Sequence, residues 1–383
     1  MSKQPLSTIA DRNRRYEAII ERFDRGKSFL VTGHANPDAD CLASMVGVCL
    51  VLRKLMKPVC LLTAGHMPKN LDYLLTIADY NGVSVNKCSD AAGAAPADTL
   101  IVCDTAKRTL LPSNPEIENL LQRKETVIIE IDHHLGGDSA YLRENEIALV
   151  DRASSACSLL ARVAWKLDSK GSVEEVFSRN VVVTLLTGMV GDTQFGRAVG
   201  TRREGRIYAL LTGFLDGLLR EQTFSEGNFT NAETLYSEMV RLTEAEKQVW
   251  AYLMERRQIE GAVGYIVLAP AESTELFDRF GADVVVAVTR SATDRLAEES
   301  GRIGLVVYYD ERHEQSLVQC RMRRNYGYTD VDLREILERL SIDDGGGHPG
   351  AIGFRFPRER IDDYPRLVQE IVSAANRLAD EAV

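Results

Sequence analysis

The sequence of 383 residues predicts an α/β protein in which a parallel-sheet α/β domain is joined by a helical linker to a smaller α/β domain. Three observations lead to this prediction. Short, mostly apolar runs alternate with helical patterns in the first half, which is typical of a parallel sheet covered on both faces. A charged helical stretch follows, and a second strand-rich region begins near residue 260. The chain is also long enough for two hydrophobic cores.

The first domain is expected over residues 1–220 and begins with an amphipathic helix. In chain order, the expected elements are a helix at 6–23, a strand at 28–33, a helix at 41–56, and strands at 58–63, 98–104 and 126–132. Helices dominate residues 153–255. Within that stretch, the apolar segment NVVVTLLTGMV is interpreted as a buried helix because it is longer than an ordinary strand.

The helical linker is expected over residues 221–258 and the second domain over residues 259–383. Four segments of the second domain are interpreted as strands, namely GAVGYIVLA, ADVVVAVTR, RIGLVVYYDE and SLVQCRMRR. A helix at DVDLREILERL and a glycine-rich turn follow them. The sequence shows no internal repeat and no low-complexity tract.

Composition and charge exclude several classes of protein. Hydrophobic residues make up 45% and charged residues 27%, as in an ordinary globular protein. No apolar run reaches the ~18 to 20 residues that span a membrane, and the N-terminus lacks the apolar segment of a secretory signal. The net charge of −10 argues against a surface that coats long nucleic acid. A small phosphorylated ligand is compatible with it, because metal ions reverse the local potential at one site.

The seven cysteines are an odd number, are widely spaced and form no C-x-x-C motif. A disulfide framework or a structural zinc site would show a closer spacing. The cysteines are therefore expected to be reduced core residues, and the location is expected to be cytoplasmic.

Acidic and histidine side chains cluster at the ends of the expected strands and of one apolar helix. They are His34, Asp38, Asp40, Asp104, Asp132, His133, His134 and Asp192. In an open parallel sheet, ligands bind outside the carboxyl ends of the strands, so these groups are expected to converge there. A lone aspartate at a strand end is usually a turn former or a helix N-cap. That explanation does not easily account for Asp-His-His after one apolar strand together with H-x-x-x-D-x-D after another.

Five carboxylates that converge in a low-dielectric cleft would repel one another strongly, and a pair of divalent cations relieves that repulsion. Aspartate and histidine ligands without cysteine suit Mn²⁺, with Mg²⁺ or Fe²⁺ as alternatives, better than structural zinc. Two metals about 3.5 to 4 Å apart would hold a nucleophilic water and the phosphoryl oxygens for hydrolysis.

At these residues the chain resembles the DHH phosphoesterase superfamily, which is named for its Asp-His-His motif. The segments GHANPDADCLAS, VCDTAKR, IDHH and TGMVGDTQF resemble its four motifs and occur in the same order. DGGGHPGAIGF resembles the GGGH motif of the DHH-associated C-terminal domain, and SLVQCRMRR resembles the arginine-bearing strand of that domain. The resemblance extends to the branch that contains oligoribonucleases (nanoRNases), 3′-phosphoadenosine 5′-phosphate phosphatases and phosphodiesterases of cyclic or linear dinucleotides.

The resemblance implies a role for each residue. Those that match metal ligands are His34 and Asp38 for the first metal, Asp40, His133 and Asp192 for the second, and Asp104 as the bridge. Asp132 matches an acid that orients histidine, and His134 would assist at the scissile phosphate or protonate the leaving oxygen. The residues that match substrate-binding positions are Arg321, Gly345, Gly346, Gly347 and His348. The active site is expected in the cleft between the two domains.

The leading hypothesis is a metal-dependent phosphoesterase that hydrolyses short oligoribonucleotides, linear dinucleotides such as pApA or pGpG, or 3′-phosphoadenosine 5′-phosphate to mononucleotides. Alternatives are a cyclic-dinucleotide phosphodiesterase, and an inorganic pyrophosphatase or exopolyphosphatase. A further alternative, a non-catalytic nucleotide sensor, predicts missing ligands, but all six candidate ligands are present. The expected partners are small nucleotides, without long nucleic acid or membrane, and the family's common homodimer is implied.

Overall fold

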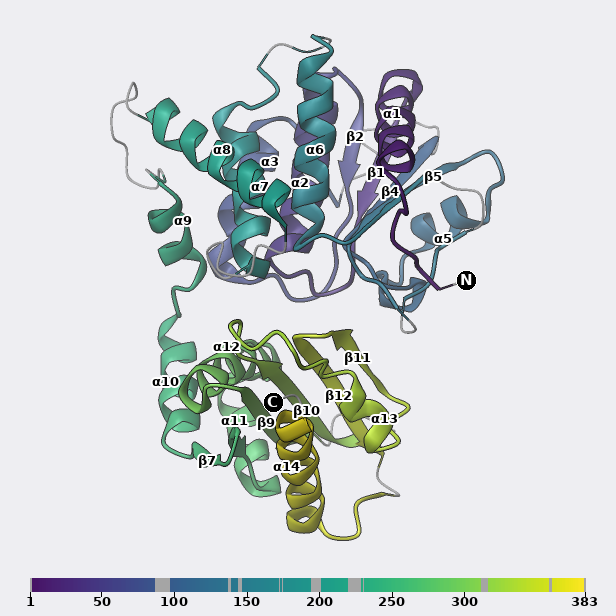
Figure 1. The fold of residues 1–383 in the computed structure, drawn as a ribbon. Helices are drawn as coiled ribbons and strands as arrows, with labels where there is room; N and C mark the ends of the chain where they lie inside the picture. Colours follow the sequence, from purple (N-terminus) through teal and green to yellow (C-terminus); the bar gives the residue numbers. More distant parts are fainter. Residues whose placement is uncertain are drawn as a thin grey trace. The chain divides into compact units, whose positions relative to one another are not determined.

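The structure is a computed structural model. It describes residues 2–86, 97–136, 139–143, 147–171, 173, 175–193, 201–219, 229, 231–310, 316–357 and 360–381. The chain divides into two compact units, Met1–Arg241 and Leu242–Val383, and each unit has its own sheet (Figure 1). None of the helices in the described part of the chain is long and apolar enough to cross a membrane.

The first unit is built on a six-stranded sheet in the order β3-β2-β1-β4-β5-β6, and every pair of neighbouring strands is parallel. The strands are β1 (Phe29–Thr32), β2 (Val59–Leu61), β3 (Ser84–Val85), β4 (Thr99–Cys103), β5 (Val127–Asp132) and β6 (Ile147–Val150). This arrangement confirms the expected parallel sheet. Because β1, β4 and β5 are neighbours, their carboxyl ends lie at one edge.

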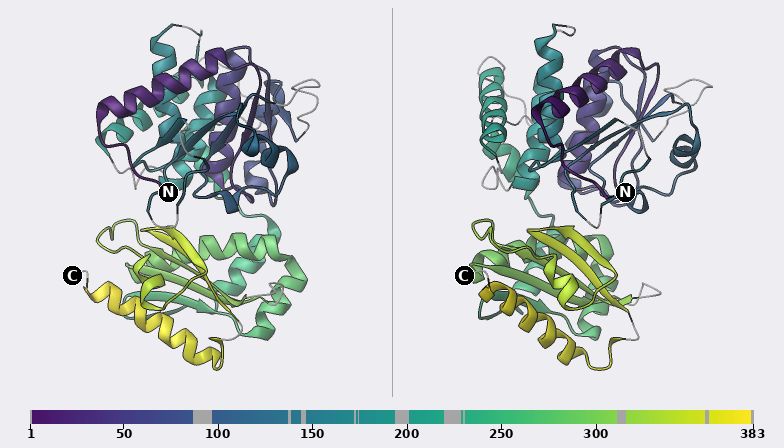
Figure 2. Two further views of the ribbon diagram at one scale, coloured as in Figure 1. Left: turned by 90° about the vertical axis from the view of Figure 1, so that its right-hand side faces the viewer. Right: turned by 45° about the vertical axis from the view of Figure 1, so that its right-hand side comes forward.

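Helices cover both faces of this sheet (Figure 2). One face packs against α1, α2 and α6, and α7 packs on α2 and α6 in the same core, whereas the other face packs against α5. The helices are α1 (Ile9–Arg25), α2 (Ala39–Lys54), α3 (Asp72–Tyr80), α5 (Pro115–Gln122), α6 (Ala156–Ser169), α7 (Arg179–Thr193), α8 (Arg202–Leu219) and α9 (Ala232–Met239). The segment NVVVTLLTGMV lies in α7, which confirms it as a helix. Its nearly continuous apolar sequence follows from burial on almost every side.

The second unit has a mixed six-stranded sheet in the order β11-β12-β10-β9-β8-β7, in which only the β8–β9 pair is parallel. One face of this sheet packs against α14, and the other face packs against α10, α11 and α12 (Figure 1). The strands are β7 (Gln258–Glu260), β8 (Val263–Val267), β9 (Ile303–Tyr309), β10 (Ser316–Arg324), β11 (Gly345–His348) and β12 (Ala351–Pro357). The helices are α10 (Glu244–Met254), α11 (Pro270–Phe280), α12 (Ala282–Ser300), α13 (Glu335–Arg339) and α14 (Tyr364–Glu381).

The prediction of a strand at ADVVVAVTR is wrong, because this segment forms the first half of the 19-residue helix α12. Its β-branched residues favour a strand locally. The buried positions Val285, Val288, Ala292 and Leu296 instead follow helical spacing and pack in the core beside Val306 of β9. Tertiary packing over a longer segment therefore overrides the local preference.

The glycine-rich turn expected at GGGH is also wrong, because these residues form strand β11, which pairs with β12. A Cβ atom at Gly345 would lie 2.8 Å from Cβ of Phe354, and Gly347 has a φ of +142°. The glycines are therefore required by close strand packing and by backbone conformation. The helix expected at DVDLREILERL is shorter than the pattern suggested and is α13.

The boundary between the units falls after Arg241, within the stretch expected to be the linker. Helix α9 belongs to the first unit and α10 to the second. Residues 221–228 and 230 of that stretch lie outside the described residues. The roles of residues 1–220 in catalysis, 221–258 as a linker and 259–383 in substrate binding remain predictions.

Cysteine chemistry departs from expectation at one position. Five cysteines are free and buried, as expected, namely Cys41, Cys49, Cys103, Cys157 and Cys320. Cys60 is disulfide-bonded, so the expectation of a reduced thiol is wrong for this residue. Cys88 lies outside the described residues.

Close packing of β9 against α12 predicts that Gly304→Ala destabilises the protein. A Cβ atom at Gly304 would lie 2.0 Å from the carbonyl oxygen of Thr293 and 2.7 Å from the backbone nitrogen of Ala297. Both are backbone atoms that no side-chain rotation can move. We expect the free energy of unfolding, measured by denaturant titration, to fall by about 1–3 kcal/mol.

The matched control is Gly213→Ala in α8, where an added Cβ meets nothing within 4 Å. Alanine is the better helix former, so this variant should gain up to about 1 kcal/mol. Equal losses in both variants would contradict the packing explanation.

Candidate functional site

The structure brings together all eight residues that the sequence singled out in the first unit. They lie at the carboxyl edge of the parallel sheet, where β1, β4 and β5 end beside the first turn of α2 and the last turn of α7. The side chains that meet there are His34, Asp38, Asp40, Asp104, Asp132, His133, His134 and Asp192.

Asp104 lies at the centre of this cluster. Its Oδ2 is 3.8 Å from Nε2 of His34, and its Oδ1 is 3.2 Å from Nε2 of His133. The side chain is buried, and Oδ1 accepts no hydrogen bond of normal geometry from the described residues. The backbone φ of +47° is unusual for a residue other than glycine, and such conformations cluster at functional sites. One carboxylate oxygen is thus turned toward each histidine, as a bridging ligand requires.

Three further carboxylates, those of Asp38, Asp40 and Asp192, each lie near one of the same two histidines. Nε2 of His34 is 3.9 Å from Oδ1 of Asp38. Nε2 of His133 is 3.9 Å from Oδ2 of Asp40 and 3.4 Å from Oδ2 of Asp192. Ligand atoms bound at about 2.1 Å to one cation lie about 3 Å apart when they are at right angles. Each group therefore has a donor set and a spacing that a divalent cation can draw together.

Both histidines direct Nδ1 toward a backbone carbonyl oxygen. The distance is 3.0 Å from His34 to Ala35 and 3.2 Å from His133 to Ala153. Because a carbonyl only accepts hydrogen bonds, Nδ1 carries a proton, so a neutral ring would have its lone pair on Nε2. Nε2 faces carboxylate oxygens, which would repel such a lone pair and favour a proton or a cation there. This is the orientation of metal-ligating histidines, in which a cation between the two groups removes the repulsion.

Asp40 is held by the N-terminus of α6. The backbone nitrogens of Ala156 and Cys157 donate to its two oxygens at 2.5 and 3.0 Å. Gly188 of α7 makes this packing possible, since a Cβ atom there would lie 2.6 Å from Oδ1 of Asp40. Burial, followed by repulsion from Asp104, raises the pKa of Asp40 to about 7. The carboxylate is therefore costly to ionise where no cation compensates it.

The pKa values of neighbouring groups show the same excess of negative charge. Burial, followed by Asp40, raises the pKa of Asp192 well above its ordinary value. Burial alone would lower the pKa of His133, but Asp104, Asp192 and Asp40 outweigh it and raise that pKa. The cluster thus retains protons that a bound metal ion would displace.

Asp132 has different surroundings from the other carboxylates. Its Oδ1 accepts hydrogen bonds from Nδ1 of His134 at 2.7 Å and from the backbone nitrogens of His133 and His134 at 2.9 and 3.2 Å. Its Oδ2 accepts one from Nζ of Lys3 at 2.8 Å. Burial would raise the pKa of Asp132, but His134 and Lys3 hold it well below its usual range. Asp132 therefore has a hydrogen-bond partner on each oxygen, and its surroundings favour the carboxylate form.

Two supporting residues escaped the sequence analysis. Lys3 contacts Asp132 from 129 positions away. Glu204 of α8 accepts hydrogen bonds from the backbone nitrogen and Oγ of Ser154, at 2.7 and 3.1 Å, beside the Ala153 carbonyl that faces His133. No motif marks Lys3. Glu204 ends the T-x-x-E pattern of a helix start with Thr201, but that pattern does not reveal its contact with Ser154, which is distant in sequence.

In the second unit, Arg321 and His348 lie on the same face of the sheet. Strand pairing places Arg321 opposite Gly353, and Gly353 opposite Gly346. His348 lies opposite Ala351, two positions along β12 from Gly353. Directly paired residues point to the same face. Only small residues therefore separate Arg321 from His348, and Gly345 and Gly347 project toward the other face.

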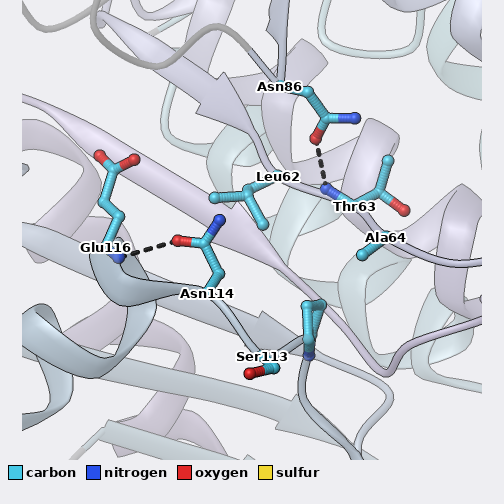
Figure 3. Close-up of a pocket in the computed structure, with 8 residues that line it drawn as sticks. Leu62, Thr63, Ala64, Asn86, Ser113, Asn114 and Glu116 are labelled. Atoms are coloured by element: carbon cyan, nitrogen blue, oxygen red, sulfur yellow. Dashed lines mark hydrogen bonds between the residues drawn. The ribbon is translucent and has the colours of Figure 1, made fainter.

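A cavity of about 200 Å³ lies beyond the carboxyl end of β2 (Figure 3). The residues that line it are Leu62, Thr63, Ala64, Asn86, Pro112, Ser113, Asn114 and Glu116. It borders the loop after β1, since the backbone nitrogen of Asn36 donates to the oxygen of Ala64 at 3.0 Å. None of the predicted site residues lines it.

The arrangement around Asp104 predicts a metal-dependent gain in stability. We expect Mn²⁺ at a hundredfold excess over its Kd to stabilise the parent protein by about 2.7 kcal/mol. Asp104→Asn should lose most of this gain, because the amide nitrogen cannot ligate a cation. Without metal the variant should be at least as stable as the parent, since one of several repelling carboxylates is gone.

Thermal unfolding with Mn²⁺ and with EDTA measures both effects. Asp79→Asn, at an exposed position of α3, is the matched control and should keep the parental response to Mn²⁺. A full Mn²⁺ response in Asp104→Asn would contradict the central position of this carboxylate.

Two curated relatives cover most of the chain. It is 23% identical over 341 residues to the "Probable bifunctional oligoribonuclease and PAP phosphatase NrnA" of Streptococcus mutans, covering 88% of this chain and 92% of that protein. It is 25% identical over 341 residues to the "Cyclic-di-AMP phosphodiesterase GdpP" of Geobacillus thermodenitrificans, covering 86% of this chain. The match spans only 45% of the Geobacillus protein.

A solved structure and a family profile complete the comparison. An exopolyphosphatase-related protein from Bacteroides fragilis matches with a TM-score of 0.71 at 15% identity, covering 97% of this chain and 98% of the other, and so shares the fold. Residues 28–189 match the profile of the DHH family, N-terminal domain, a range that holds every residue of the cluster except Asp192. Residues 28–189 are therefore a DHH-family N-terminal domain.

Proposed function

We propose that this protein is a two-metal phosphoesterase that hydrolyses short nucleotides to mononucleotides. The position of Asp104, with one oxygen toward each of two histidine-carboxylate groups, is the observation that carries the proposal. The DHH-family N-terminal domain supports a hydrolase. We propose catalysis in residues 1–220, a linker over 221–258 and substrate binding in 259–383.

Six residues of the first unit would hold the metal ions. We assign His34 and Asp38 to one ion, Asp40, His133 and Asp192 to the other, and Asp104 to both. Oxygen and imidazole donors favour Mn²⁺, with Mg²⁺ or Fe²⁺ as alternatives. The thiol of Cys41 lies within 4.8 Å of the nearest donor atoms of His34 and Asp104, but burial raises its pKa well above the ordinary value, so it stays protonated and is a poor ligand.

Bound ions of this kind would supply an activated water and neutralise charge on the phosphoryl oxygens. The side chains of the protein would orient the imidazole rings and protonate the leaving oxygen. His34 and His133 keep their Nδ1 protons on backbone carbonyls, which fixes both rings. Burial would lower the pKa of His134, but Asp132 outweighs it and raises that pKa. This shift favours the protonated ring, in which Nε2 would donate its proton to the leaving oxygen while Nδ1 stays on Asp132.

Substrate choice would belong to the second unit. We propose that Arg321 and His348 bind a phosphate or base of the nucleotide, since they flank small residues on one sheet face. An arginine can hold a phosphate through two parallel hydrogen bonds. Gly345, Gly346 and Gly347 would allow the backbone of β11 to approach the nucleotide.

The named relatives supply the substrate classes to be tested. NrnA is described as acting on oligoribonucleotides and PAP, which favours linear nucleotides and 3′-phosphoadenosine 5′-phosphate. Similarity to GdpP over 86% of this chain makes cyclic di-AMP the second candidate. The homodimer implied by the resemblance and the cytoplasmic location expected from the cysteine pattern remain part of this proposal.

Product analysis on a substrate panel tests the proposal. With Mn²⁺ we expect mononucleotides from pApA or pGpG, or phosphate from 3′-phosphoadenosine 5′-phosphate, and no turnover with EDTA. The panel also includes longer oligoribonucleotides, cyclic di-AMP and pyrophosphate. Turnover of pyrophosphate alone would contradict a nucleotide substrate. An absence of turnover with Mn²⁺, Mg²⁺ and Fe²⁺ on every substrate would contradict an enzyme.

The role of the second unit predicts a selective effect of His348→Ala. We expect KM for the preferred nucleotide to rise about tenfold, which corresponds to about 1.4 kcal/mol of lost binding. Turnover of bis-p-nitrophenyl phosphate should change much less. Arg257→Ala, which removes a partly exposed ion pair with Glu299, is the control in the same unit. Equal losses on both substrates would show that His348 serves the chemistry or the fold.

A further inference from the structure

Lys3 is a buried lysine to which the sequence motifs assign no role. Its side chain is 1% exposed, and lysine is almost never buried to this extent unless it is paired. Nζ donates to Oδ2 of Asp132 at 2.8 Å and to the carbonyl oxygen of Thr105 at 2.7 Å. It also lies 2.9 Å from Oε2 of Glu130, an ion-pair contact without normal hydrogen-bond geometry. The ammonium group thus connects β5 to the residue that follows Asp104.

Hydrogen bonds on either side of Lys3 fix the N-terminal segment, residues 2–4. Ser2 forms an antiparallel bridge with Ala140, and the backbone nitrogen of Lys3 donates to the oxygen of Ser139 at 3.2 Å. The backbone nitrogen of Gln4 donates to the hydroxyl of Tyr141 at 3.2 Å. These partners follow His134 in the chain. The segment therefore packs along the loop that leaves the Asp-His-His motif.

The contact of Lys3 with Asp132 has a geometric consequence for His134. Oδ2 of Asp132 is held by Lys3, and Oδ1 is held by Nδ1 of His134. A rotation of this carboxylate that released His134 would also break the contact with Lys3. We propose that Lys3 is a positioning residue, which fixes the carboxylate of Asp132 and through it the ring of His134. This inference rests on the proposed phosphoesterase function.

A purely structural role for Lys3 would be different. Glu130 and Asp132 lie two positions apart on β5, so they project to the same face, and both are buried. Lys3 could merely compensate their charge. The pair of substitutions Lys3→Met and Glu130→Gln separates the two roles, because the double variant has the same cluster charge as the parent but lacks the contact with Asp132.

We expect Lys3→Met to lower Tm and to lower kcat about 10- to 100-fold, as is usual when a group that orients a ligand is removed, with KM within about twofold. The double variant should recover Tm and keep the low kcat. Glu130→Gln alone should retain kcat, because the Lys3–Asp132 contact remains and the amide oxygen still serves the backbone nitrogen of Leu142. Recovery of kcat together with Tm in the double variant would overturn the proposal.

A second measurement separates this inference from the proposed function. In histidine-labelled protein with diamagnetic Mg²⁺, NMR should show a slowly exchanging Nδ1 proton of His134 in the parent and in Glu130→Gln. The signal should be broadened by exchange in Lys3→Met and in the double variant. If the parent turns over no substrate in the panel, the proposed function fails, and this signal alone decides the role of Lys3. An identical signal in all four proteins would overturn that role.

Discussion

Repulsion among the carboxylates around Asp104 is the constraint on which the rest of the first unit depends. Asp104 is buried beside the Nε2 atoms of His34 and His133, and Asp40 is buried beside that of His133. Left alone, these groups would separate or take up protons. Rigid elements hold them instead: amide groups at the start of α6 hold Asp40, and backbone carbonyls fix both imidazole rings. Such a site is expected to bind cations strongly, because its negative charge is held in place and is not compensated.

The two kinds of buried carboxylate differ in what compensates them. Asp132 has Lys3 and His134 as partners, and its pKa is depressed. Asp40 and Asp192 have no cationic side chain other than a protonated His133 against them among the described residues, and their pKa values are raised. Opposite shifts within one cluster separate the carboxylate that orients a side chain from those suited to a metal ion.

Much of the fold was predictable because local pattern and tertiary role agree. The strands β1, β4 and β5 are buried on both faces, which is why they appear as mostly hydrophobic runs, with the buried Glu130 of β5 as an exception. The prediction failed where the two disagree. The ADVVVAVTR segment is β-branched yet helical, because its buried residues recur at helical spacing against β9. GGGH has the composition of a turn, yet it is a strand whose neighbours leave little room for a side chain.

The sequence by itself determined which chemical groups gather at the site, because parallel strands bring every residue that follows a carboxyl end to one edge. The DHH motif and the histidine after β1 could be located on that rule alone. Only the tertiary structure decided how these groups are held. Lys3, Glu204 and the carbonyl of Ala153 act through contacts with residues distant in sequence, and such contacts leave no periodicity or spacing in the chain. Their roles follow from packing, which no local pattern encodes.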